Sequence, residues 1–119
     1  MEGFQLNIKI FKIVDVVIDR PLGSKHPVYD LTYPINYGYV ENVFSGDGKE
    51  QDCYVLGVDE PITHFKGKVI AIIHRKDDVE DKWVVANKSY TKEEIKKLTY
   101  FTEKYFDSDI IVDEEEVDL

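Results

Sequence analysis

The sequence has 119 residues and a formal net charge of −9, and hydrophobic residues make up 43% of it. This length suits one domain over residues 1–119 with a single hydrophobic core, and the composition excludes a chain that is disordered throughout. The negative charge argues against a nucleic-acid-binding protein, which normally presents a basic surface. The single cysteine, Cys53, excludes an internal disulfide. With no apolar run of roughly 20 residues to span a membrane, we expect a cytoplasmic protein without a membrane partner.

The first half of the chain predicts strands separated by turns. Alternating apolar and polar residues, or β-branched runs, indicate extended structure. We expect strands, in whole or in part, over residues 4–10, 13–19, 33–43 and 52–58. Segments rich in proline, glycine or aspartate indicate loops. They lie at residues 20–27, 45–48 and 59–68.

The second half predicts two more strands and a helix. The run at 68–75 is apolar on both faces, which is typical of a central strand, and 81–86 is its return strand after a charged hairpin loop. Thr91 and Glu94 form a capping box at the start of a helix over about 91–106. We therefore expect an α+β fold, mainly β: a small barrel with one C-terminal amphipathic helix packed on it. The acidic end of the chain, 113–119, is expected to be a solvated tail.

Three acids and one lysine crowd into the segment GDGKEQD. Asp47, Glu50 and Asp52 carry the oxygen ligands that Mg²⁺ prefers. The same letters also suit an ordinary polar turn, in which Asp and Gly are common. Lys49, among these acids, either contacts a bound phosphate, pairs with a neighbouring acid, or points to solvent, as most lysines on turns do.

A second acidic group lies in the loop RKDDVEDK. Its four acids repel one another unless a cation neutralises them. They are Asp77, Asp78, Glu80 and Asp81. A solvated charged hairpin explains the same pattern, so metal binding and a plain surface loop both stay open here.

Tyrosines mark the segment YPINYGY. Tyr33, Tyr37 and Tyr39 are separated by even numbers of positions, so an extended chain places them on one face. Tyrosine hydroxyls in a pocket donate hydrogen bonds to phosphate oxygens, whereas the same rings also fill hydrophobic cores. The preceding loop, GSKHP, offers Lys25 as a group that can bind an anion.

Taken together and in this order, five segments resemble the soluble family I inorganic pyrophosphatases, most closely a short bacterial branch. They are VVIDRP, YPINYGYVENV, GDGKEQDCYVLG, EDKWVVA and YFTEKY, and the likeness runs over about 14–106. The tyrosine motif followed closely by the acid motif is the specific part. The resemblance implies a five-stranded OB-like barrel and hydrolysis of pyrophosphate to two phosphates with Mg²⁺, or Mn²⁺ as an alternative. It also implies a homo-oligomer.

The resemblance assigns roles to single residues. Asp47 and Asp52 match the first and last acids of the family's D-x-D-P-x-D motif and would be metal ligands, as would Asp19. Two further ligands would come from the acidic loop: Asp77 or Asp78, and Glu80 or Asp81. Substrate-binding positions match Lys25, Tyr33, Tyr37, Lys82 and Tyr105.

Two positions depart from the family pattern. Lys49 stands where the family has the middle acid, which accepts a proton from the attacking water, and Phe106 stands where it has a second lysine. Asp52 and Glu50 are then the expected catalytic residues, unless the metal ions suffice without a base. Because a general base contributes about 10²–10⁴-fold, slowed hydrolysis of this small phosphate substrate is the expected function. The alternative is a catalytically weakened protein that binds phosphate or metal on the same scaffold.

Overall fold

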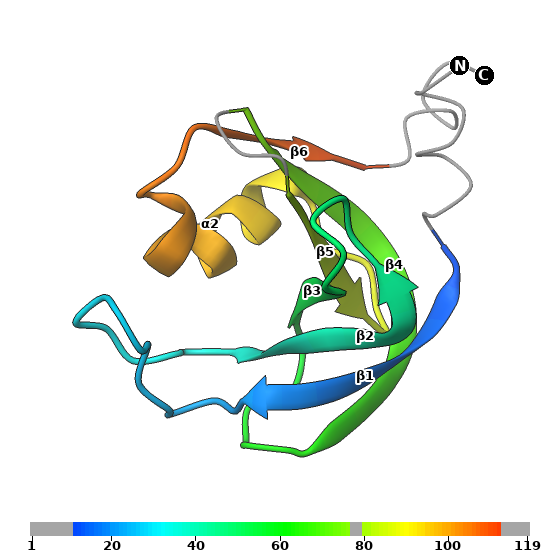
Figure 1. Ribbon diagram of the computed structural model, residues 1–119, viewed down its shortest axis with the longest axis horizontal. Helices are drawn as coiled ribbons and strands as arrows, with labels where there is room; N and C mark the ends of the chain where they lie inside the picture. Colours follow the sequence, from blue (N-terminus) through cyan, green and yellow to red (C-terminus); the bar gives the residue numbers. More distant parts are fainter. Residues whose placement is uncertain (1–10, 77–79, 113–119) are drawn as a thin grey trace.

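The computed structural model describes residues 11–76 and 80–112, which form a closed β-barrel with a helix beside it (Figure 1). The strands are β1 (Ile13–Arg20), β2 (Asn36–Phe44), β3 (Glu50–Val55), β4 (His64–Arg75), β5 (Asp81–Ala86) and β6 (Ser108–Ile111). The helix α2 is Lys92–Glu103. None of the helices in these two ranges has the length and apolar character that a membrane crossing requires.

The barrel closes because β4 is long enough to serve two neighbours in turn. The strand order is β1-β2-β3-β5-β4, and β1 pairs with β4 to complete the ring. The first part of β4, residues 64–68, pairs with β1, and its last part, residues 72–75, pairs with β6. The β3–β5 pair is parallel and the other pairs are antiparallel. This closed five-stranded mixed barrel with one helix confirms the predicted OB-like, mainly β fold.

The strands are buried on both faces where the barrel wall separates two cores. Ile72 and Ala71 are adjacent on β4 and fully buried, yet they belong to different hydrophobic clusters. One cluster fills the barrel around Trp83. The other lies beneath α2, where Ile95 is fully buried. The prediction that the 68–75 run is a strand apolar on both faces is confirmed.

Local sequence patterns predicted most of the strands and the helix, but the observed elements begin or end at different residues from those expected. The Thr91–Glu94 capping box forms in both directions at the start of α2. The helix ends at Glu103 rather than at 106, and β4 begins four residues before the expected 68. The short strand β6 was not predicted. The expected strand at 4–10 and the tail 113–119 lie outside the described residues.

Candidate active site

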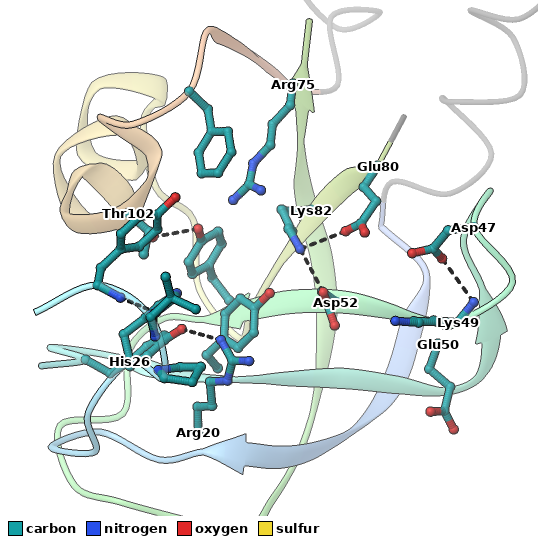
Figure 2. A pocket seen from close by; sticks show the side chains of 17 residues that line it. Arg20, His26, Asp47, Lys49, Glu50, Asp52, Arg75, Glu80, Lys82 and Thr102 are labelled. Carbon is teal, nitrogen blue, oxygen red and sulfur yellow. Dashed lines mark hydrogen bonds and ion pairs between the residues drawn. The ribbon is translucent and has the colours of Figure 1, made fainter. Parts of the chain in front are cut away.

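A pocket of about 460 Å³ opens where the barrel meets α2 (Figure 2). Each of the five barrel strands contributes a side chain to it, so segments far apart in the sequence converge. Nine residues singled out in the sequence line it: Tyr33, Tyr37, Asp47, Lys49, Glu50, Asp52, Glu80, Lys82 and Phe106. The eight other lining residues, which the sequence did not assign to the site, are Arg20, His26, Pro27, Val28, Tyr29, Tyr54, Arg75 and Thr102.

The centre of the pocket is an ion-paired group on two neighbouring strands. Because β3 and β5 run parallel, with Cys53 opposite Trp83, they bring Asp52 and Lys82 to the same place. The Lys82 ammonium donates to Asp52 Oδ2 at 2.7 Å and to Glu80 Oε1 at 2.9 Å. Burial alone would lower the pKa of Lys82, but the hydrogen bonds and charges of the two carboxylates outweigh it and raise that pKa. Lys82 is therefore a fixed cation between two acids.

Asp47 lies on the turn before β3, with its carboxylate at the edge of the pocket. The Ser45 hydroxyl and the Lys49 backbone N–H both donate to Asp47 Oδ1. These bonds, in that order, together with the side chain of Glu80 within hydrogen-bonding reach, lower the pKa of Asp47 to about 2. Two carboxyl groups this close need a proton or a cation between them, because like charges repel.

The carboxylates fit a divalent cation by chemistry and charge. Asp47, Asp52 and Glu80 offer only hard oxygen donors, which suit Mg²⁺ or Mn²⁺ rather than a soft metal. Within residues 11–76 and 80–112, no three acidic, histidine or cysteine side chains form a ready-made metal cluster. Lys82 now supplies the positive charge between two of these acids. The donor set suits the ion, and the loop acids Asp77 and Asp78 lie outside the described residues.

Arginine and tyrosine form the opposite wall. Arg20, at the end of β1, donates from Nη1 to the Tyr33 hydroxyl at 2.8 Å, and its guanidinium carbon lies 5.6 Å from the centre of the Tyr37 ring. Both tyrosines are almost fully buried. Burial, and next the negative charge of Asp52, raise the pKa of Tyr37, so its hydroxyl stays protonated. This wall offers hydrogen-bond donors to an anion.

Four predicted site residues do not line this pocket. Lys25 and Asp19 are exposed beside it, although the charge of Asp52 acts on Asp19 and helps to raise its pKa after burial does. Asp81 instead bonds His74 Nδ1 at 2.8 Å. Tyr105 is about half exposed and stacks on Tyr29 with ring centres 4.3 Å apart. Of the two loop acids Glu80 and Asp81, Glu80 is the one in the pocket.

Lys49 and Glu50 lie at the exposed rim. Among the described residues, the Lys49 ammonium forms no ion pair, so pairing with Asp47 or Glu50 is not what this structure shows. Lys49 is exposed, as expected for a turn lysine, but it also lines the pocket. Figure 2 shows the Glu50 carboxylate directed away from Asp52. The role of Glu50 as a base remains a prediction.

Arg20 and Arg75 are the charged residues that sequence reasoning missed. Arg20 precedes Pro21, and Arg75 ends the apolar run KVIAIIHR, so both look like strand-boundary residues. A signal was present, because an arginine that closes a buried strand must keep its charge paired or facing a cavity. Within the pocket they are the two arginines.

Comparisons with known proteins identify the family of this chain and relate its fold to solved structures. The family model for inorganic pyrophosphatase matches residues 15–110. A search of curated proteins found no significant match.

Solved structures of bacterial enzymes share the fold. The inorganic pyrophosphatase from Ehrlichia chaffeensis matches with a TM-score of 0.65 and 14% identity, over 82% of this chain and 83% of that chain. The one from Coxiella burnetii matches with a TM-score of 0.62 and 15% identity, over 86% of this chain and 85% of that chain. The one from Helicobacter pylori matches with a TM-score of 0.60 and 17% identity, over 85% of this chain and 82% of that chain. At such low sequence identities, these structural matches show only that the fold is shared. Because the family model covers most of the sequence, the chain belongs to the inorganic pyrophosphatase family.

Proposed function

We propose that this protein hydrolyses inorganic pyrophosphate to two phosphates in a reaction that depends on Mg²⁺. The observation that carries the proposal is one pocket in which carboxylates surround Lys82, while arginine and tyrosine donors form the opposite wall. A highly charged phosphoanhydride needs both, because cations must neutralise it and donors must orient it. Family membership supports the same reaction.

The acids are proposed to hold the metal. Asp47, Asp52 and Glu80 are its ligands on the described residues, with Asp77 and Asp78 as further candidates on the neighbouring loop. When bound, Mg²⁺ or Mn²⁺ neutralises phosphate charge and lowers the pKa of an attacking water. The Ser45 and Lys49 bonds that hold Asp47 ionised keep this carboxylate ready as a ligand.

The opposite wall is proposed to hold the substrate. Tyr37 keeps its proton and donates it in a hydrogen bond to a phosphate oxygen, and Arg20 supplies a planar cation whose fork of N–H groups matches phosphate. Lys82, held between Asp52 and Glu80, adds a point charge at the centre. Position 49 carries a lysine instead of a carboxylate that could accept a proton from the attacking water. Turnover is therefore expected to be slow.

Phosphate release from pyrophosphate, measured with purified folded protein, tests the proposal. We expect turnover above background in Mg²⁺ or Mn²⁺ and none once a chelator removes the metal. Asp52→Asn should lower kcat by more than about 10²-fold, since even residues behind a metal ligand cost about 10–100-fold. Asp59→Asn, an exposed change outside the pocket, is the matched control. Turnover at background with both metals, or full activity in Asp52→Asn, would contradict the proposal.

A further inference from the structure

Lys82, on β5, is the least exposed of the four cations that line the pocket. The residue is 5% exposed, and its ammonium lies 2.7 Å from Asp52 Oδ2 and 2.9 Å from Glu80 Oε1. A buried ammonium is costly unless anions or other acceptors pair with it. Both ion pairs that Lys82 makes within the described part of the chain are with acids proposed above as metal ligands.

The two carboxylates are more exposed than the lysine that joins them. The side chain of Asp52 is 36% exposed and that of Glu80 is 27% exposed, against 7% for Lys82. Glu80 also lies within hydrogen-bonding reach of Asp47. Figure 2 shows the Lys82 ammonium joined to both carboxylates, on the side of the pocket that also carries Asp47. A divalent cation that binds Asp52 and Glu80 therefore competes with this ammonium for the same oxygen atoms.

The charges around Lys82 oppose the binding of either ligand alone. If a metal ion takes the two carboxylates and no phosphate is present, Lys82 is left as a buried cation without these acceptors, and like charges repel. If a phosphate takes the ammonium and no metal is present, the acids lose their counter-ion and repel the phosphate. When both ligands are present, the carboxylates pair with the metal ion and the ammonium pairs with the phosphate.

We infer that Lys82 is a specificity-determining residue that opposes the binding of a bare divalent cation and favours metal and phosphate together. This role rests on the proposed function, because it concerns the metal and the phosphate groups that hydrolysis requires. It goes beyond the point charge that Lys82 offers to the substrate, since the same ammonium occupies the metal ligands while the pocket is empty. Thermodynamic linkage makes the coupling reciprocal, so each ligand strengthens the binding of the other by the same factor.

Calorimetric titration with Mg²⁺, first without phosphate and then with saturating inorganic phosphate, tests this inference without turnover. Phosphate should lower the Kd of Mg²⁺ for the wild type about 5- to 150-fold, the usual range for coupled sites. Lys82→Met should bind Mg²⁺ alone at least about 5-fold more tightly than the wild type, because no ammonium competes for the carboxylates. The same variant should bind phosphate about 10- to 100-fold more weakly in the presence of Mg²⁺, the worth of hydrogen bonds to a charged group.

Three further variants separate this competition from a general effect of charge or of folding. Lys82→Gln also removes the charge but keeps an amide donor, and it should bind Mg²⁺ and phosphate as Lys82→Met does. Lys49→Met removes a charge from an exposed position on the pocket rim, and Lys97→Met removes one from an exposed position on α2 outside the pocket. Both should change the Kd of Mg²⁺ far less than Lys82→Met does. Thermal unfolding shows whether each variant is folded.

The outcomes separate this inference from the proposed function. Tighter Mg²⁺ binding together with weaker phosphate binding in the Lys82 variants supports the inference. Unchanged or weaker Mg²⁺ binding in a folded Lys82 variant overturns it and leaves hydrolysis standing, since the lysine then only positions the carboxylates. Equal tightening in Lys49→Met also overturns it, because any positive charge near the pocket would then have the same effect. A wild type that shows the coupling but releases no phosphate from pyrophosphate contradicts the proposed function and supports the role of Lys82.

Discussion

Lys49 stands at the position where the resemblance to the family predicts an acid. Its ammonium is exposed at the pocket rim, and Asp47 and Asp52 stand on either side of it in sequence. A charged lysine neither ligates a metal ion nor accepts a proton. It adds positive charge at a place where a carboxylate would add a ligand or a base.

Lys49→Asp is therefore expected to increase the rate of pyrophosphate hydrolysis. The new carboxylate would lie in the pocket and either bind metal or accept a proton, so kcat should rise, by up to about 10²-fold if it acts as a base. Initial rates of phosphate release at saturating Mg²⁺ measure the effect. Lys88→Asp, which makes the same charge change on an exposed residue outside this pocket, is the control. A fall in kcat would show instead that Lys49 contacts the substrate.

The sequence predicted individual site residues where these residues belong to a recognisable motif. Asp47, Asp52, Tyr37 and Lys82 were singled out, and the structure brings all four to one pocket. The arginines were not, because their importance depends on contacts made across the fold. Arg75 meets Glu103 from a segment 28 positions away, and no local pattern announces such a pair.

At the scale of elements, the contact between β1 and β2 sets the position of Arg20. Ile18 pairs with Gly38 and Arg20 pairs with Tyr37, so the register shifts between them. Such a bulge turns a side chain to a new direction and increases the local twist. A β-carbon on Gly38 would clash with the Val17 carbonyl oxygen. The close approach of these strands therefore depends on glycine at this position.

Gly38→Ala should destabilise the protein by about 3 kcal/mol or more, the upper end of the cost of overpacking, since the clash is with backbone. Chemical denaturation measures the free energy of unfolding. Gly23→Ala is the matched control, because its β-carbon meets nothing within 4 Å and only its φ of +92° opposes the change. That strain costs about 1–2 kcal/mol. Equal stability of the two variants would show that β1 shifts without penalty.

Elements were predictable to the extent that their signals are local. The capping box of α2 lies within four residues, and the sequence alone placed the helix start. β6 has only four residues and forms against the end of β4, so its pairing depends on the complete barrel. The early start of β4 has the same cause, since residues 64–68 are extended by pairing with β1.

The whole molecule has to attract an anion although its net charge is −9. The charges that line the pocket are more evenly balanced than those of the whole chain, because the lining acids are matched by an equal number of lysines and arginines. These are Asp47, Glu50, Asp52 and Glu80 against Arg20, Lys49, Arg75 and Lys82. A divalent cation added to such a pocket makes its field positive, which is how an acidic protein binds a phosphate substrate. Barrel closure brings these charges together.

Calorimetric titration of the protein with Mg²⁺ tests this account most directly. We expect saturable uptake by the wild type and its loss in Asp47→Asn/Asp52→Asn, while Asp59→Asn binds like the wild type. Each of these proteins keeps the acidic segment at residues 113–119, so weak binding there cancels in the comparison. The account is contradicted if the wild type takes up no Mg²⁺, or if the double variant takes up as much as the wild type.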